Sequence, residues 1–284
     1  MVGNEILPMR LARPSRRGTA GAFDLSLVIP AYNEAERLPL ALDRLSTWMA
    51  RAPFRVEPIV VDDGSSDATA AAAVAHRSGC GVIRLRRNSG KGAAVRVGVL
   101  HGRGRIVAFT DADLPYRMEA VERAFALIDE GAADMVVGAR DLAQSAMQVH
   151  RPWQRTIASS LFRAITHMLV SRQVHDTQCG LKVFSRQAAA DVFPRVHTNG
   201  FAFDAEAILV ARRLGLVAAR VPVVLVHEAG STVSLRRHGP QMLRDIVRSR
   251  RRHARGVGPA SAAIPDYDIL RTVAGGNGRL REAA

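Results

Sequence analysis

Short apolar runs alternate with helix-like stretches through the first half of the chain, and this alternation constrains the fold more than any other feature. Each run ends in a polar cluster, and a stretch of helical composition follows. A short apolar run bounded by turn residues is typical of a strand buried on both faces. The pattern therefore predicts an α/β fold with a mostly parallel central sheet and helices on both faces. The runs are Leu25–Ile29, Ile59–Val61, Val82–Leu85, Ile106–Phe109 and Met135–Val137.

The polar clusters after these runs are the expected place for the chemistry. In open parallel sheets, ligands bind outside the carboxyl ends of the strands, so loops that follow different strands meet at one edge. Four such loops carry carboxylates, an amide or a lysine, and we expect them to share one site. They are 32–34 (Tyr-Asn-Glu), 62–67 (Asp-Asp-Gly-Ser-Ser-Asp), 88–92 (Asn-Ser-Gly-Lys-Gly) and 111–113 (Asp-Ala-Asp).

Asp111 and Asp113 are candidate metal ligands because they lie one residue apart, directly after a predicted strand. In an extended loop both carboxylates can reach one hard cation, an arrangement that suits Mg²⁺ or Mn²⁺ carrying a diphosphate. A turn with two helix-capping aspartates explains the same tripeptide equally well.

The other two clusters also leave two interpretations open. Residues 62–67 can accept hydrogen bonds from a base or ribose, or they can cap the next helix. Residues 88–92 lack the spacing of a P-loop. They either present backbone amides and the Lys91 ammonium to a phosphate, or form an exposed loop.

The composition of the two ends predicts one folded domain between flexible segments. Residues 1–22 hold arginines among Pro, Gly and Ala, which is typical of a flexible basic tail. The Gly- and Ala-rich residues 256–284 predict a second flexible tail, so we place the domain at 23–255.

The second half of the domain is expected to contain two helices and a final strand. The helices are predicted over 156–170 and 241–255, and the strand over 221–226. The helix at 241–255 is basic and amphipathic. Its apolar face either enters a membrane interface or packs in an ordinary core. That face holds Met242, Leu243, Ile246 and Val247.

The formal charge of +14, from 40 Lys and Arg against 26 Asp and Glu, predicts an anionic partner. Nucleic acid is disfavoured because no DNA- or RNA-binding signature is present and aromatics make up only 5% of the chain. The anionic partners that remain are a membrane surface and phosphorylated substrates.

The location expected from the sequence is the cytoplasmic side of a membrane. Cys80 and Cys179 have neither disulfide-like nor zinc-like spacing, which favours a reducing compartment. No long apolar run and no secretion signal are evident, so we expect peripheral binding at the inner face without a transmembrane segment.

Taken together, the motifs resemble a known enzyme family. In this order, 28–34, 61–67, 88–92 and 111–114 are similar to the inverting nucleotide-sugar glycosyltransferases with the GT-A (nucleotide-diphospho-sugar transferase) fold. Asp176-Thr-Gln-Cys-Gly-Leu-Lys-Val-Phe184 and Phe203-Asp-Ala-Glu206 resemble the branch that makes polyprenyl- or dolichyl-phosphate sugars. The resemblance implies metal-dependent transfer of a hexose from a nucleotide sugar to polyprenyl phosphate. Similarity to dolichyl-phosphate glucosyltransferases makes UDP-glucose the preferred donor and GDP-mannose the second choice.

The resemblance also implies roles for individual residues on the donor side. Asp111 faces the nucleotide and Asp113 is the principal metal ligand. Asp62 or Asp63 holds the base or ribose. The remaining donor contacts are Pro30, Tyr32, Glu34, Lys91 and Ala112.

On the acceptor side the resemblance implies a cluster of positive charge. Asp113, Arg140 and Lys182 are the expected catalytic residues. The acceptor phosphate is expected near Arg140, Arg151, Arg155, Asp176 and Gln178. Structural roles are the alternative for two acids: a turn cap for Asp176 and an ion pair with an arginine for Asp204.

Two positions depart from the family pattern, and the absence of a base motif bears on the acceptor. Pro115 replaces the usual Gln or Ser, and Ala139 replaces the usual Ser. An alcohol acceptor needs a general base, whereas a phosphate monoester, with a second pKa near ~6, is already anionic. The chain has no Thr-Glu-Asp-type base motif. A lipid phosphate is therefore favoured, and a soluble sugar or small metabolite is the alternative acceptor.

Overall fold

A central sheet organises the part of the chain that the computed structural model describes, which is residues 22–140, 142, 179–226 and 235–273. The strands lie in the order β7-β5-β6-β4-β1-β2-β3-β8. Their bounds are β1 Leu25–Ala31, β2 Val56–Asp62, β3 Gly81–Leu85, β4 Ile106–Phe109, β5 Met135–Ala139, β6 Lys182–Ser185, β7 Ala218–Pro222 and β8 Tyr267–Arg271.

Most of the strand pairs are parallel, as the sequence predicts. β1 pairs in parallel with β2 and β4, β2 with β3, and β5 with β7. β6 is antiparallel to both β4 and β5, and β8 is antiparallel to β3. The carboxyl ends of β1, β2, β4 and β5 therefore lie along one edge of the sheet, where the polar loops begin.

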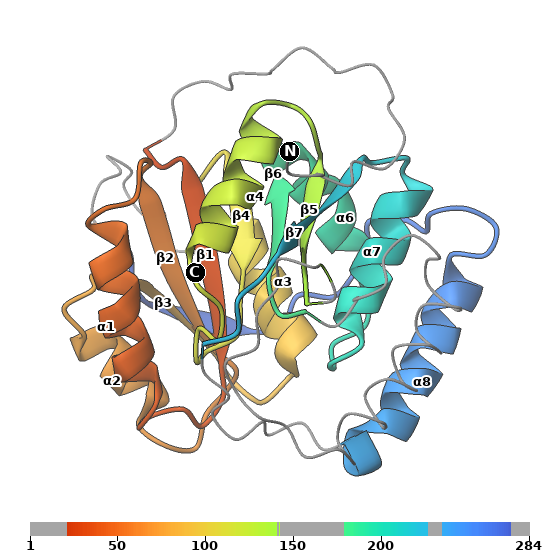
Figure 1. Cartoon of the computed structure of the whole chain (residues 1–284). Helices are drawn as coiled ribbons and strands as arrows, with labels where there is room; N and C mark the ends of the chain where they lie inside the picture. Colours follow the sequence, from red (N-terminus) through yellow and green to blue (C-terminus); the bar gives the residue numbers. More distant parts are fainter. Residues whose placement is uncertain (1–21, 141, 143–178, 227–234, 274–284) are drawn as a thin grey trace.

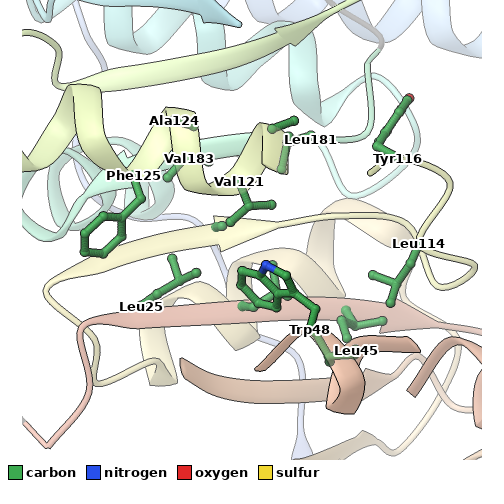
Figure 2. Close-up of a cluster of buried hydrophobic side chains, with 14 of the residues drawn as sticks. Leu25, Leu45, Trp48, Leu114, Tyr116, Val121, Ala124, Phe125, Leu181 and Val183 are labelled. Carbon is green, nitrogen blue, oxygen red and sulfur yellow. The ribbon is translucent and has the colours of Figure 1, made fainter. Parts of the chain in front are cut away.

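Helices cover both faces of the sheet because its strands are apolar on both sides (Figure 1). Leu27 and Ile29 of β1 belong to the cluster that contains α1 and α4, whereas Val28 between them belongs to the cluster that contains α3 and α7. Figure 2 shows the first of these clusters. The helices are α1 Leu38–Met49, α2 Thr69–Ala75, α3 Lys91–His101, α4 Glu119–Asp129, α6 Arg186–Val192, the 3₁₀ helix η1 Phe193–Arg195, α7 Phe203–Arg213 and α8 Leu235–Arg252.

The last parallel strand begins and ends earlier than the predicted 221–226. β7 ends at Pro222, and the amide of Val223 still donates to the carbonyl of Ala139 at the end of β5 at 3.2 Å. The amide of Val226 donates to the carbonyl of Pro115 at 2.8 Å, and Leu225 forms an isolated bridge with Tyr116. The backbone of residues 224–226 therefore pairs with the loop that follows β4.

The expected flexible tail from residue 256 is wrong for part of its length. Tyr267–Arg271 forms β8 on the outer edge of β3, and Arg271 donates to the carbonyl of Val74 at 2.7 Å. Composition alone missed this strand because it is short and largely exposed. The predicted tail at 1–22, apart from residue 22, and the predicted helix at 156–170 lie outside the described residues.

The apolar face of α8 packs in the protein core. Met242 and Ile246 are buried in the same cluster as α7, and Leu243 and Val247 are half-buried. The interpretation that this face enters a membrane is therefore wrong, because Met242 and Ile246 are already covered by protein. Arg244, Arg248, Arg250 and Arg251 of α8 are exposed, and Arg252, exposed as a residue, has its guanidinium paired with Glu206 of α7.

Candidate active site

The loops after β1 and β2 are joined to each other by hydrogen bonds. Asn33, which has a positive φ of 53°, accepts the amide of Ser66 on its side-chain oxygen at 3.0 Å. The Asn33 amide donates to the Ser65 hydroxyl at 2.9 Å, and the Glu34 amide donates to Thr69 Oγ1 at 2.8 Å. The segments 32–34 and 62–67 therefore form one surface, as expected for a shared site.

The three predicted donor residues of the first loop differ in exposure. Pro30 is buried near the end of β1, whereas Tyr32 is 45% exposed. Glu34 is half-buried and pairs with Arg37 at 2.8 Å. Burial raises the pKa of Glu34, while Arg37 opposes the rise and the nearby Asp113 adds to it. Tyr32 thus lies where a ligand can reach it, whereas the Glu34 side chain is only 14% exposed.

Asp62 is a buried anchor for its own turn. Its Oδ1 accepts the amide of Ser65 at 3.1 Å and also the Ser65 hydroxyl, and Arg84 Nε lies 3.3 Å from Oδ2. The carboxylate is fully buried while Arg84 is half exposed. In this arrangement a ligand meets Arg84 before it meets Asp62.

Asp63 joins its loop to the glycine-rich segment that precedes α3. Its two oxygens accept the amides of Ser89 at 2.8 Å and Gly90 at 2.9 Å. Burial raises the pKa of Asp63 to about 6, with the two amides opposing the rise and Asp62 adding to it. Contact of Asp62 or Asp63 with a base or ribose stays a prediction, because the groups that contact both carboxylates here belong to the protein.

Lys91 begins α3 and pairs with the first aspartate of the 111–113 loop. Its Nζ lies 2.5 Å from Asp111 Oδ1. Burial opposes ionisation of both groups, yet their mutual attraction raises the pKa of Lys91 and lowers that of Asp111. The Lys91 ammonium also lies 5.9 Å from the centre of the ring of Phe203, the first residue of the Phe203-Asp-Ala-Glu206 motif. Both charged side chains keep some exposure, 21% and 33%.

Asp113 is the second carboxylate of this loop, and protein groups on its backbone hold it in place. The Asp113 carbonyl accepts Arg44 of α1 at 2.6 Å, and the amide of Leu114, which has a positive φ of 44°, donates to the Asp111 carbonyl at 3.1 Å. Burial and then Asp111 raise the pKa of Asp113, while Arg37 lowers it. Ala112 between the aspartates is half-buried.

The donor set of this loop fits a hard divalent cation. Asp111 and Asp113 repel each other, and a cation between them would remove that repulsion. No three acidic, cysteine or histidine side chains within the described part of the chain form a metal-binding cluster. Two carboxylates with substrate phosphates completing the coordination is the usual arrangement for Mg²⁺.

Gly180 is a site residue for which the sequence motifs predict no role. A Cβ at this position would lie 1.9 Å from Asp111 Oδ2, so only glycine leaves room for the carboxylate. The Gly180 amide also lies 3.3 Å from the Tyr116 hydroxyl as a donor. The signal was available in the sequence, since Gly180 belongs to the Asp-Thr-Gln-Cys-Gly signature directly before a strand.

Lys182 lies beneath the site instead of lining it. Its side chain has no exposed surface, and its Nζ lies 2.9 Å from Asp204 Oδ1 and donates to the Cys179 carbonyl at 2.5 Å. Direct contact with substrate is therefore not supported for Lys182. The partner of Asp204 is this lysine and not an arginine. Lys182 acts on the site through its field, because its charge helps to lower the pKa of Asp111.

Arg140 follows β5 and completes the charged edge. It is half-buried, and it lies near enough to Asp111 to help lower the pKa of that carboxyl. Antiparallel β6 brings Lys182 opposite Phe109, so the ends of β4, β5 and β6 meet here. The four other predicted acceptor residues, Arg151, Arg155, Asp176 and Gln178, lie outside the described residues.

Known proteins share both this sequence pattern and this fold. The model of the family described as Glycosyl transferase family 2 matches residues 26–193. The dolichyl-phosphate beta-glucosyltransferase of Dictyostelium discoideum is 33% identical over 247 residues, which cover 82% of this chain and 76% of the relative. The Homo sapiens protein of the same name is 31% identical, with 82% and 76% covered.

Solved structures with this fold include two sugar-phosphoglycerate synthases. Mannosyl-3-phosphoglycerate synthase from Rubrobacter xylanophilus matches with a TM-score of 0.61 at 20% identity, over 82% of this chain and 74% of that one. Glucosyl-3-phosphoglycerate synthase from Mycobacterium tuberculosis, in complex with Mn²⁺, UDP and glucosyl-3-phosphoglycerate, matches at 0.57 and 22% identity, over 80% and 78%. The protein thus belongs to glycosyl transferase family 2 and is a glycosyltransferase with the GT-A fold.

Proposed function

We propose that the protein transfers glucose from UDP-glucose to a polyprenyl phosphate of the dolichyl type, with inversion at the anomeric carbon and with Mg²⁺ or Mn²⁺ as cofactor. The activity for which the similar curated proteins are named supports the sugar and the acceptor. The complex of the Mycobacterium tuberculosis synthase with Mn²⁺ and UDP, on the same fold, supports the cofactor and the nucleotide. GDP-mannose remains the second donor to test.

The observation that carries the proposal is the row of charges at the end of β4. Asp111 and Asp113 lie beside Lys91, with Arg140 nearby, so the site combines a place for a cation with two positive side chains. A divalent ion bound there would stabilise negative charge on a diphosphate. Such a site favours departure of a nucleoside diphosphate over most other group transfers.

The reaction that these residues serve is a single displacement. An oxygen of the acceptor phosphate forms a bond to the anomeric carbon while the bond from that carbon to the diphosphate oxygen breaks. The electron pair leaves with the nucleoside diphosphate. Because the attacking oxygen is already anionic, the chain needs to orient it and screen its charge, and we assign this role to Arg140. Lys91 is placed to hold the departing diphosphate.

The membrane part of the proposal rests on α8. Its exposed arginines form a basic surface suited to anionic lipids such as those of the cytoplasmic leaflet, and its apolar face serves the core. No helix within the described residues has the length and hydrophobicity that crossing a bilayer requires. We therefore propose peripheral, electrostatic binding at the membrane surface, without insertion of α8.

The test is a product assay with a donor panel. Purified protein is incubated with polyprenyl phosphate, Mg²⁺ or Mn²⁺ and either UDP-glucose or GDP-mannose, and the lipid product is identified by mass. Glucosyl phosphoryl polyprenol formed only with metal is the expected result. A mannosylated lipid would change the donor assignment. Transfer to a soluble acceptor such as 3-phosphoglycerate, with none to the lipid, would overturn the proposed acceptor.

A further inference from the structure

A polar cavity lies between α8 and the loop that precedes α7. Its volume is about 210 Å³. One wall is the loop 197–200, and the other is formed by Gln241, Asp245, Arg248 and Arg252 of α8. The loop 197–200 also contacts the donor-side segment 88–92, because the Asn199 carbonyl accepts the amide of Gly92 at 2.7 Å. The roles assigned to the candidate active site use none of these cavity residues.

The wall of the cavity is fixed by a buried carboxylate. Glu206 of α7 accepts the amides of His197 at 3.1 Å and Thr198 at 2.7 Å. The same carboxylate pairs with Arg252 at 3.1 Å and with His253 at 3.0 Å. The backbone of this wall and the Arg252 guanidinium are therefore held in place before any ligand arrives, which reduces the entropy lost on binding.

The polar groups that face the cavity are of two kinds. Arg248 and Arg252 line the cavity and supply its positive charge, and Arg252 is also paired with Glu206. Asp245 and the amide side chain of Gln241 supply hydrogen-bond acceptors on the same helix. The cavity can therefore hold a group that combines an anion with hydroxyls.

We propose that this cavity binds the headgroup of a glycerophospholipid, with the phosphate on Arg248 and Arg252 and the headgroup hydroxyls on Asp245 and Gln241. Arginine forms paired hydrogen bonds with phosphate oxygens, and a cavity of this volume accommodates a phosphoglycerol group. The inference rests on the proposed membrane association and adds to it a preference for one class of lipid.

The surroundings of the cavity favour a lipid over free phosphate. α8 lies at the right margin of the molecule in Figure 1, and the positive charge continues along it past the cavity at Arg244, Arg250 and Arg251. A single small anion in the cavity would not contact these other arginines. A membrane surface presents many anionic headgroups, which can contact all of them at once.

The experiment compares vesicles of equal charge but different headgroups. Phosphatidylcholine vesicles are mixed with either phosphatidylglycerol or phosphatidylserine, both of which carry one net negative charge. The serine carboxylate would face Asp245, so we expect the full-length protein to bind phosphatidylglycerol vesicles more tightly. Binding is measured by co-sedimentation at two salt concentrations.

Two matched variants separate the cavity from general electrostatic attraction. Arg248→Gln and Arg251→Gln remove the same charge from the same helix, and only Arg248 lines the cavity. Arg251→Gln should weaken binding to both vesicles by about fivefold and keep the preference. Arg248→Gln should weaken binding to phosphatidylglycerol vesicles by at least about tenfold and abolish the preference. Thermal denaturation checks that both variants are folded.

The outcomes distinguish this inference from the proposed function. Two results would overturn the proposed role of the cavity: an equal loss of vesicle binding in both variants, or equal binding of the unaltered protein to phosphatidylglycerol and phosphatidylserine vesicles. Displacement from vesicles by inorganic phosphate as readily as by glycerol 1-phosphate would also overturn it, because the site would then recognise an anion only. If the protein makes no glucosyl lipid but still prefers phosphatidylglycerol vesicles, the proposed reaction is wrong and the proposed lipid site is supported.

Discussion

Replacing Gly180 by alanine should inactivate the enzyme without unfolding it. The added Cβ would lie 1.9 Å from Asp111 Oδ2 and 2.6 Å from Asp111 Cγ, and a side-chain carbon essentially never comes closer than 3.0 Å to such an atom. The Asp111 carboxylate must therefore move by about 1 Å, and a displacement of that size near reacting groups can lower kcat/KM by about 10²-fold. The loss corresponds to about 2.7 kcal/mol of transition-state stabilisation.

The fold should survive because the atoms in the way belong to the end of a side chain. Asp111 is partly exposed and can rotate, although rotation breaks its 2.5 Å pair with Lys91. The melting temperature should thus stay within a few degrees of the unaltered protein, as for most substitutions that leave the core intact. Affinity for Mn²⁺, measured by calorimetry with UDP present, should fall together with the rate of transfer.

A second glycine provides the control for this variant. A Cβ on Gly258 would meet His253 at 3.9 Å, which is an ordinary contact. Gly258→Ala should therefore keep both activity and Mn²⁺ affinity. Full activity of Gly180→Ala would refute the view that Gly180 sets the position of Asp111, and unfolding of that variant would show that Gly180 serves the fold instead.

Three further predictions test the carboxylate, the arginine and the buried network. Asp113→Asn should lower kcat by at least ~10²-fold, even at saturating Mn²⁺, because it removes a metal ligand; near-normal turnover would exclude that role. Arg140→Ala should raise the KM for polyprenyl phosphate by about tenfold or more and leave the KM for UDP-glucose nearly unchanged, which steady-state kinetics with both substrates would show. Burial alone would raise the pKa of Glu206, but hydrogen bonds from His253 and Thr198 hold it at about 2 against 4.5 for a free glutamate. The unfolded state therefore binds more protons than the folded state between these values, so about 3 kcal/mol of stability should be lost as the pH falls from about 5 to 2; chemical denaturation of Glu206→Gln should show a smaller loss over that range.

The parallel part of the sheet and the position of the site could be predicted because both follow from local patterns. Each apolar run formed the strand expected of it, and the polar loops gathered at the edge where parallel strands end. The antiparallel strand β6 was missed because only Val183 and Phe184 are apolar in it, and its lysine resembled a catalytic residue. In the structure, strand alternation turns Lys182 into the interior, where Asp204 satisfies it. A single sequence does not reveal that pairing, because the two residues lie on different elements.

The contacts that shape the site mostly join residues far apart in the chain, and the sequence could not predict these contacts. Gly180 lies against Asp111, and the Asn199 carbonyl holds the first turn of α3 through Gly92. Such contacts depend on how β6 and α7 pack, and periodicity fixes only the type of an element. The glycines were visible in the motifs, but the atom that excludes a side chain from each is known only from the fold.

α8 shows why pattern alone leaves two interpretations of a basic amphipathic helix. An apolar stripe beside a row of arginines suits a membrane interface and a protein core equally well, since both offer the stripe a place away from water. What decides between them is whether another apolar surface of the same chain is free to receive the stripe. Here α7 provides that surface, and Met242 and Ile246 are buried against it. Arg244, Arg248, Arg250 and Arg251 stay exposed, so any attraction of α8 to a membrane must come from charge. Binding of the protein to anionic vesicles should consequently decrease steeply as salt is raised, whereas binding by an inserted apolar face would not.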